Sequence, residues 1–314
     1  MTNNLQTLDC WFLTGPTAAG KTGVGIALAD RLGAEIISLD SMALYRGMDI
    51  GTAKPTADQR AAVPHHLIDL IEPEDDFSVA RYLDAAAAAI ADIRSRSREV
   101  LFVGGTPLYL KALLRGLFDG PDADWDFRAE IEEELQRVGQ QALYERLVQV
   151  DPLAAAQLHP NDTRRLIRAL EVYRITGKPI SHQQTEFDEG RPAEACRVFV
   201  LQRPKDQLHA RIDRRVERMF DEGLVDEARR LTSDGRRLGR TASQAVGYCE
   251  AINHLSGESS LEEAMLRVTT RTRRFAKRQA TWFRSLSECR SVSVEGEVPI
   301  DEITERILSL ARQG

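Results

Sequence analysis

The segment GPTAAGKT, residues 15–22, is the feature that most restricts how this chain can fold. It matches the pattern G-x-x-x-x-G-K-[ST] at every fixed position, after an apolar run (10–15) and before a helical pattern (21–33). In this strand–loop–helix setting, backbone N–H groups and the positive end of the helix dipole face one anion. The segment therefore predicts a polyphosphate site at the carboxyl end of a buried parallel strand.

The loop residues have separate expected roles. The N–H groups of residues 17–22 are expected to donate to phosphate oxygens, and Lys21 to supply a mobile cation. The Thr22 hydroxyl is placed to bind Mg²⁺. The complete predicted phosphate site consists of Gly15, Pro16, Thr17, Ala18, Ala19, Gly20, Lys21 and Thr22.

Short apolar runs alternate with helical patterns along the chain. Runs at 34–40, 66–71 and 99–106 are predicted to be further strands, and the alanine-rich segment 79–96 to be a helix. A run at 290–295 is a predicted edge strand. Such alternation is typical of a parallel sheet with helices on both faces. The expected fold class is α/β, with a P-loop NTPase-like core.

From about residue 120 the strand signal stops, and helical periodicity with a strongly charged surface replaces it. A β-like run after residue 196 returns the chain to the sheet. The stretch 120–196 is therefore predicted to be an all-helical insertion domain in a core made of 1–119 and 197–314. Its end could lie as early as about residue 160, because the helix at 162–177 could pack on either body.

The charge along the chain is uneven, although the formal net charge is only −6. Residues 267–284 contain basic residues and no acid, whereas acids are concentrated at 122–135. Aromatic residues are interleaved with the cations, either as a core face or as stacking partners for bases. The pattern favours contact with a nucleic-acid backbone over a solvated face. The negative net charge favours a structured RNA over non-specific DNA binding.

The start of the sequence has neither a basic segment nor a long apolar core, so no signal peptide is expected. No apolar run is long enough to span a bilayer. The four cysteines lie far apart without CxxC spacing, which favours reduced thiols over disulfides or zinc. We therefore expect a cytoplasmic protein without membrane contact.

Two further strand ends carry candidate catalytic side chains. Asp40 ends one strand, where a carboxylate can act as a general base, a metal ligand or a turn residue. Thr106 follows two glycines, where it can donate to a phosphate oxygen or form a turn before Pro107. Lys54, in the segment after Asp40, is expected to lie on the solvated surface.

Arginines of a later helix form a third candidate group. Arg211, Arg215 and Arg218 lie at i, i+4 and i+7, away from an apolar face. A solvated stripe paired with nearby acids would explain them. An arginine that reaches a leaving phosphate would also explain them, because the guanidinium fork suits phosphate oxygens.

Six sequence blocks occur in one order: the phosphate loop, ISLDSMALYRGMDIGTAKP, HHLID, VGGTPLYLKALLRGL, RRLIRALEVYRITGKPIS and QAVGY. In this combination the chain resembles the bacterial tRNA dimethylallyltransferases (the IPP transferase family) from about Cys10 to Ser285. The resemblance implies transfer of a dimethylallyl group from dimethylallyl diphosphate to N6 of the adenosine 3′ of the anticodon, tRNA position 37. The products are N6-(dimethylallyl)adenosine and diphosphate. The phosphate loop would then hold the donor's diphosphate, with Mg²⁺, and no nucleotide need be hydrolysed.

The resemblance also implies roles for individual residues. Asp40 is the implied general base toward the N6 amine, and Thr106 and Arg215 stabilise the departing diphosphate. The insertion contacts the tRNA anticodon stem-loop, and a monomer is the default expectation. The residues implied to contact tRNA are Asp40, Ser41, Met42, Ala43, Thr106, Arg128, Arg164, Arg165, Arg168, Gln244, Gly247, Tyr248, Arg271, Arg273, Arg274, Lys277 and Arg278.

Two other functions use the same motifs. A small-molecule or nucleoside kinase would bind ATP at the loop and use Asp40 on an acceptor hydroxyl, but it gives the basic segment no role. A non-catalytic RNA-binding P-loop protein explains the basic segment, but it leaves Asp40, Thr106 and Arg215 without a role.

Overall fold

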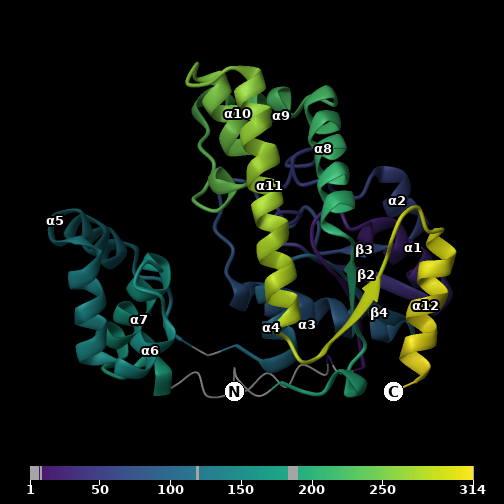
Figure 1. The fold of residues 1–314 in the computed structure, drawn as a ribbon, viewed down its shortest axis with the longest axis horizontal. Coiled ribbons are helices and arrows are strands. Elements are labelled where there is room, and N and C mark those ends of the chain that lie inside the picture. Colours follow the sequence, from purple (N-terminus) through teal and green to yellow (C-terminus); the bar gives the residue numbers. More distant parts are fainter. Residues whose placement is uncertain (1–6, 8, 118–119, 183–189, 314) are drawn as a thin grey trace. The chain divides into compact units, whose positions relative to one another are not determined.

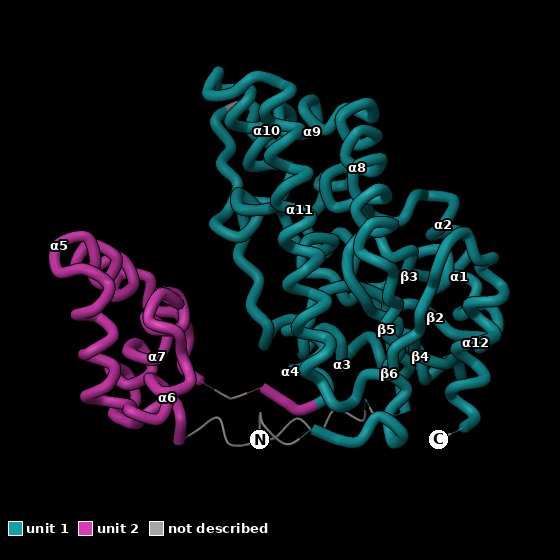
Figure 2. The backbone as a smooth tube through the Cα atoms, in the orientation of Figure 1, with its two compact units in different colours: residues 1–114, 190–314 teal, residues 115–189 magenta. Residues whose placement is uncertain are grey.

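The computed structural model describes residues 7, 9–117, 120–182 and 190–313. The chain divides into two compact units (Figure 2). The first comprises Met1–Leu114 and Gly190–Gly314, and the second comprises Arg115–Glu189. The predicted boundaries follow residues 119 and 196, and the first of these lies outside the described residues.

The first unit is built on a six-stranded sheet in which every strand pair is parallel, as the alternating pattern predicts. The strand order is β3-β2-β4-β1-β5-β6. β1, which leads into the phosphate loop, is therefore central, between β4 and β5. The strands are β1 (Trp11–Thr14), β2 (Ala34–Leu39), β3 (His65–His66), β4 (Glu99–Gly104), β5 (Val198–Gln202) and β6 (Cys289–Ser293).

Successive side chains of a strand point to opposite faces of the sheet, and both faces of this sheet are apolar. On one face, Leu13 of β1 packs in a core with Leu28 and Ile307, which lie on α1 and α12. At positions one residue away in the strands, the rings of Phe12 and Phe102 stack with centroids 4.8 Å apart. The two faces explain why these strands are almost continuously apolar.

Helices cover the sheet and extend beyond it (Figure 1). None of the described helices is both long and apolar enough to cross a membrane. The helices that accompany the sheet are α1 (Lys21–Leu32), α2 (Ala57–Ala62), α3 (Val79–Ser95), α4 (Pro107–Arg115), α8 (Lys205–Asp221), α9 (Leu224–Leu231), α10 (Tyr248–Leu255), α11 (Leu261–Arg284) and α12 (Ile300–Arg312), with 3₁₀ turns η3 (Ala193–Ala195), η4 (Ser233–Gly235) and η5 (Ala242–Gln244).

The predicted strand at 66–71 is reduced to β3 and one isolated bridge between Tyr45 and Ile71. Leu67 and Asp69 have φ angles of 58° and 54°, in the left-handed region that an extended strand excludes. The chain therefore leaves the sheet early and brings Asp69 against Lys54, with Nζ and Oδ1 2.6 Å apart.

The second unit is helical. It contains α5 (Trp125–Val150), α6 (Pro152–Gln157), α7 (Thr163–Thr176) and the 3₁₀ turn η1 (Ile180–His182). Gly139 interrupts α5 with φ 82° and ψ 167°, so that α5 consists of two helical segments. A separate hydrophobic core joins α5 to α7 through Ile131, Leu147, Leu166 and Leu170. The sequence allowed α7 to pack on either body, and the structure shows that it packs within the insertion.

A buried carboxylate organises this second unit. Glu171 of α7 accepts hydrogen bonds from Arg128 Nε and Nη2 (2.7 and 2.8 Å) and from the Asp124 N–H (2.8 Å). Arg168, one turn earlier, also pairs with it. Burial acts to raise the pKa of Glu171, but the hydrogen bonds from Arg128, Arg168 and the Asp124 N–H outweigh burial, so the pKa lies below its usual value.

We expect Glu171→Gln to destabilise the second unit by about 2 kcal/mol at neutral pH, because two partly buried guanidinium groups lose their counter-ion. The folded-state pKa lies below the unfolded value of about 4.3, so the wild-type advantage exists above that pH. The advantage disappears as the pH falls through the folded-state pKa. Amide hydrogen exchange of α5 and α7 in the full chain measures this difference.

Glu130→Gln is the matched control for this prediction. Glu130 forms an exposed pair with Arg174 (3.0 Å), so its loss should cost less than about 0.5 kcal/mol. A Glu171→Gln effect of equal size at neutral pH and at about pH 3 would contradict the assignment of the effect to the ionised carboxylate.

Candidate active site

The phosphate loop connects β1 to α1 with positive φ angles that suit its glycines but not Ala18. Gly15 has φ 140°, and a Cβ atom there would lie 2.6 Å from the Leu201 carbonyl oxygen of β5. Gly20, directly before α1, has φ 103°. Ala18 also has a positive φ, 63°, which costs a residue with a side chain about 1–2 kcal/mol. Contacts from the rest of the unit must therefore hold the loop in shape.

Two arginines bind carbonyl oxygens of the loop. Arg203, just after β5, donates from Nε to the Ala19 oxygen (2.9 Å), and Arg211 of α8 donates from Nε to the Ala18 oxygen (2.8 Å). In a trans peptide the N–H and C=O groups point in opposite directions. When the Ala18 and Ala19 oxygens face the arginines, the N–H groups of Ala19 and Gly20 therefore point away from them. Arg211 was predicted only as part of a stripe of arginines, and Arg203 was not predicted, although a position at the carboxyl end of a parallel strand is a usable signal.

Arg215 and Lys21 add two positive charges to the same place. Arg215 Nη1 donates to the Thr17 hydroxyl (3.1 Å), and Lys21 Nζ donates to two carbonyl oxygens at the start of the loop (3.0 and 2.9 Å). Burial, reinforced by the Arg215 charge, lowers the pKa of Lys21 to about 8, whereas Asp40 acts in the opposite direction. Burial also lowers the pKa of Arg215. These partly desolvated cations form a site suited to a highly charged anion.

The ends of β2 and β4 bring Asp40 and Thr106 to one edge of the sheet. The Thr106 N–H donates to the Leu39 oxygen (3.1 Å), and the Thr106 hydroxyl accepts from the Ser41 N–H (3.1 Å). The Asp40 carboxylate accepts from the Met42 N–H (2.9 Å). The Gly-Gly-Thr run thus leads into α4 at Pro107 and places the Thr106 hydroxyl beside the Asp40 segment, and donation from this hydroxyl to a phosphate oxygen stays a prediction.

Two of the backbone N–H groups that were predicted to bind phosphate instead donate hydrogen bonds within the protein. The Thr17 N–H donates to Gln279 Oε1 (2.8 Å), and the Ala19 N–H donates to the Pro16 oxygen (3.3 Å). The expectation that every N–H group of residues 17–22 faces an anion is thus wrong for these two. Gln279 was not predicted. The one indication in the sequence was that a polar residue lies on the apolar face of the basic segment.

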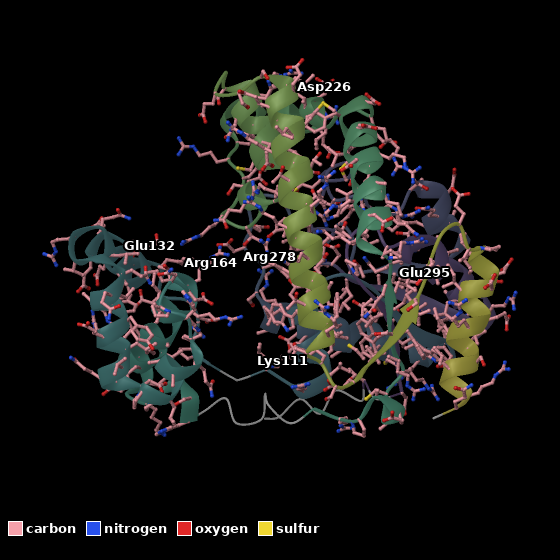
Figure 3. The ribbon with its side chains drawn as sticks, in the orientation of Figure 1. Lys111, Glu132, Arg164, Asp226, Arg278 and Glu295 are labelled. Carbon is pink, nitrogen blue, oxygen red and sulfur yellow. The ribbon has the colours of Figure 1, made fainter. Side chains whose placement is uncertain are left out.

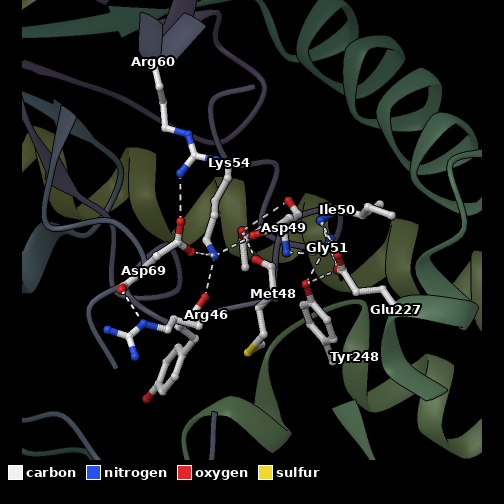
Figure 4. Close-up of polar contacts among 12 residues, drawn as sticks. Arg46, Met48, Asp49, Ile50, Gly51, Lys54, Arg60, Asp69, Glu227 and Tyr248 are labelled. Atoms are coloured by element: carbon white, nitrogen blue, oxygen red, sulfur yellow. Dashed lines mark hydrogen bonds and ion pairs between the residues drawn. The ribbon is translucent and has the colours of Figure 1, made fainter. Parts of the chain in front are cut away.

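An ion-pair network around a buried lysine fixes the segment that follows Asp40 (Figure 4). Lys54 is buried, and its Nζ lies 2.7 Å from Asp49 Oδ1 and 2.6 Å from Asp69 Oδ1. The prediction that Lys54 is solvated was wrong, because two acids close over the ammonium when the segment folds back on itself.

Glu227 of α9 holds the same segment through backbone groups (Figure 4). Its buried carboxylate accepts from the N–H groups of Asp49 (3.1 Å), Ile50 (3.0 Å) and Gly51 (3.3 Å). It also accepts from the Tyr248 hydroxyl (2.6 Å). Tyr248, implied by the resemblance to contact tRNA, is fully buried, so here it acts as a support for the segment.

The basic residues in the middle of α11, from Arg271 to Arg278, fall into two groups. In the first, Arg271 pairs with Glu250 of α10, and Arg273 Nη2 lies 2.5 Å from Asp213 Oδ2 of α8. Residues 267–284 contain no acid, but the neighbouring helices α10 and α8 supply acids to these two arginines. Their charge is therefore partly compensated inside the protein.

The second group is exposed and is called here the basic surface: Arg274, Phe275, Lys277 and Arg278. Phe275 is 38% exposed, and the Arg278 guanidinium carbon lies 5.9 Å from its ring centroid. Figure 3 locates Arg278 on α11. Three exposed cations around an aromatic ring suit phosphates and a base.

Other residues implied to contact tRNA have mixed surroundings in the first unit. Ser41 and Met42 are partly exposed next to Asp40, whereas Ala43 is buried. The Gln244 carbonyl oxygen accepts from Arg271 (3.3 Å). Gly247 lies directly before α10.

In the second unit, the four implied contact arginines also divide into two pairs. Arg164 and Arg165 are exposed on α7. Arg128 and Arg168 are bound to Glu171, so their charges are partly compensated.

Among the described residues, no group of three or more histidine, cysteine, aspartate or glutamate side chains could hold a metal ion. Thr22, the predicted metal ligand, lies in the first turn of α1 next to Lys21. A cation here would need phosphate oxygens as further ligands, which is the usual arrangement for Mg²⁺.

Comparisons of sequence give one family. Residues 43–286 match the family model described as IPP transferase. The chain is 50% identical over 311 residues to a tRNA dimethylallyltransferase of Rhodopirellula baltica, a match that covers 96% of this chain and 93% of the relative. It is 45% identical to a tRNA dimethylallyltransferase of Geobacter metallireducens, with 90% and 92% covered.

Solved structures agree with the sequence matches. A tRNA isopentenylpyrophosphate transferase from Bacillus halodurans is 41% identical, with a TM-score of 0.70 and 97% of each chain covered. A eukaryotic dimethylallyltransferase acting on tRNA is 28% identical, with a TM-score of 0.73 over 90% of this chain and 73% of that one. The resemblance carried by the sequence blocks is confirmed, and the chain belongs to the IPP transferase family.

Proposed function

We propose that this protein transfers a dimethylallyl group from dimethylallyl diphosphate to N6 of the adenosine at tRNA position 37. The observation that carries the proposal is the phosphate loop, where Lys21 Nζ lies 3.0 Å from the Gly15 oxygen and Arg215 Nη1 lies 3.1 Å from the Thr17 hydroxyl, so that two cations meet at one loop. Such a transfer needs a cationic cradle for a diphosphate and a carboxylate for the amine proton. Relatives named tRNA dimethylallyltransferase support the same choice.

The reaction exchanges a carbon–oxygen bond for a carbon–nitrogen bond. The adenosine N6 attacks the allylic carbon, and diphosphate leaves with the electron pair of the broken C–O bond. N6 loses one proton, which we assign to the Asp40 carboxylate. Because the N6 lone pair is delocalised into the ring, removal of the proton as the bond forms lowers the barrier. Lys21, Arg215, Thr106 and loop N–H groups stabilise the charge that grows on the leaving oxygens.

Mg²⁺ fits this site through the Thr22 hydroxyl and the donor's own phosphate oxygens. Mg²⁺ commonly takes few protein ligands and completes its shell with substrate phosphates and water. When bound, the ion neutralises part of the diphosphate charge. Lys21 and Arg215 act on the same charge from the protein side, and the loop N–H groups orient it.

The anticodon stem-loop of tRNA is the proposed second substrate. The basic surface of α11 offers cations to phosphates and a ring to a base. In the second unit, Arg164 and Arg165 of α7 are the proposed contacts to the stem. The target adenosine is turned out of its loop to reach Asp40, which costs a few kcal/mol, on the order of one lost stacking step. We propose that the enzyme acts as a monomer in the cytoplasm.

A P-loop small-molecule kinase is the weaker alternative. It would use the same loop for ATP and Asp40 on a hydroxyl group. The basic surface and the helical insertion have no role in such a reaction, and the relatives are named as transferases that modify tRNA.

Incubation of the protein with labelled dimethylallyl diphosphate, Mg²⁺ and unmodified tRNA tests the proposed function. After digestion to nucleosides, we expect the label in N6-(dimethylallyl)adenosine. Consumption of ATP with no labelled nucleoside would instead favour the kinase.

Asp40→Asn should lower kcat by about 100-fold or more, the usual contribution of a general base. The amide oxygen can still accept from the Met42 N–H, so the turn and the affinities for donor and tRNA should change little. Asp30→Asn, on the exposed end of α1, is the control. Transfer at the wild-type rate in Asp40→Asn would remove Asp40 from its assigned role.

The affinity for the donor should fall above a pH of about 8, because the Lys21 pKa is about 8 in the free protein. Only the protonated ammonium attracts diphosphate, so KM for the donor should rise by up to about tenfold per pH unit. Lys21→Arg keeps its charge throughout this range, so its KM should show no such rise, whatever its absolute activity. The same rise in both proteins would show that another group titrates.

Replacement of the three cations of the basic surface (Arg274, Lys277 and Arg278) by alanine should weaken tRNA binding and make it less sensitive to salt. If each cation contacts one phosphate, the plot of log association constant for tRNA against log salt concentration should become less steep, its negative slope shrinking in magnitude by about 2. A charge-matched control replaces Arg31, Arg306 and Arg312, which lie on α1 and α12. Equal slopes for the two triple variants would contradict the assignment of this surface to RNA.

A further inference from the structure

Gln279 of α11 contacts the phosphate loop and the β4 turn with the two ends of one amide. Its Oε1 accepts from the Thr17 N–H (2.8 Å), and its Nε2 donates to the Gly105 oxygen (2.5 Å). The residue is 4% exposed, so both bonds form in a largely desolvated setting. A hydrogen bond broken there would leave a buried polar group without a partner.

The two partners explain why this buried residue is a glutamine. A backbone N–H can only donate and a carbonyl oxygen can only accept, so the side chain must offer one acceptor and one donor. An ionised glutamate lacks the donor, and a lysine lacks the acceptor. The same requirement fixes which end of the Gln279 amide is oxygen.

The amide also fills the space next to the charged part of the loop. A Cβ atom at Gly105 would lie 2.7 Å from Gln279 Nε2, 3.3 Å from the Gly15 oxygen and 3.4 Å from Lys21 Nζ. The amide, the loop and the Lys21 ammonium therefore surround one point, and only glycine leaves room for them.

Thr17 is held from two helices at once. Its N–H is bound by Gln279 of α11, and its hydroxyl accepts from Arg215 of α8 (3.1 Å). Thr17 is the residue before Ala18, whose positive φ the loop does not adopt without support. The two contacts thus act on the strained part of the loop.

We propose that Gln279 is a positioning residue that sets the shape of the phosphate loop and thereby its affinity for the donor's diphosphate. This inference rests on the proposed function for the identity of the donor. By taking the Thr17 N–H, Gln279 leaves the anion to the N–H groups further along the loop. Because α11 also carries the basic surface, one helix then meets both substrates, the RNA on its exposed face and the phosphate loop on its buried face.

Two variants of Gln279 in the full chain test this role. Gln279→Met keeps the length of the side chain and loses both hydrogen bonds, and Gln279→Glu keeps the acceptor but adds a negative charge beside the diphosphate site. We measure kcat, KM for the donor, KM for tRNA, and the inhibition constant of inorganic diphosphate. We expect KM for the donor and the diphosphate constant to rise by about tenfold in Gln279→Met, and by at least as much in Gln279→Glu. KM for tRNA should change by less than about twofold.

Val268→Ala is the matched control for loss of packing in the same helix. Val268 is buried on α11, 11 positions before Gln279 and about 16 Å away along the axis, and it contacts the core shared with α8. The control should lower the melting temperature and leave the diphosphate constant unchanged.

The proposal is overturned if both Gln279 variants bind inorganic diphosphate as wild type does, or if Val268→Ala raises the constant equally. Titration of wild type and variants with diphosphate separates this outcome from a failure of the proposed function. If wild type transfers no prenyl group but the Gln279 variants still bind diphosphate more weakly, the positioning role stands and only the donor's identity is wrong.

Discussion

The phosphate loop holds Ala18 in a conformation that this residue disfavours, and most of the candidate site follows from the contacts that maintain the loop. Ala18 has a left-handed φ, and Lys21 keeps its ammonium in a partly desolvated place. The supports are Arg203 after β5, Arg211 and Arg215 on α8, and Gln279 on α11. All of them come after the helical insertion in the sequence. The motif near the start of the chain supplies the loop, and the returning part of the chain supplies its fixed surroundings, which is the preorganisation that charge stabilisation requires.

The segment after Asp40 depends on buried charges in a similar way. Lys54 is enclosed by two aspartates, and the Glu227 carboxylate gathers three backbone N–H groups and the Tyr248 hydroxyl. The buried charges of Lys54 and Glu227 both have partners, and loss of these partners would leave a buried charge unpaired, which is costly. A side chain such as Asp40 can act on a reacting amine only if its backbone is held still. These two networks hold the backbone of the segment that follows Asp40.

The parallel sheet was predictable because apolar runs between helical patterns have few other arrangements, and the strand ends then place Asp40 and Thr106 near the phosphate loop. The third strand was not, because the positive φ angles of Leu67 and Asp69 leave no mark in composition. Gln279 was not predictable for another reason. It binds loop backbone 262 positions away, and a bond to backbone imposes no residue pattern on its partner. Arg203 also binds loop backbone, 184 positions away, and only its place at the carboxyl end of a parallel strand could have indicated it. The ion pairs of Arg271 and Arg128 were not predictable either, since the acids that pair with them lie on other helices.

The most direct test of the central claim is a crystal structure of the protein with Mg²⁺ and a thio analogue of dimethylallyl diphosphate that resists cleavage. The account predicts a diphosphate within hydrogen-bond distance of Lys21, Arg215 and the N–H groups of residues 20–22, with the allylic carbon facing Asp40. A diphosphate bound away from this loop, or an allylic carbon turned away from Asp40, would contradict it.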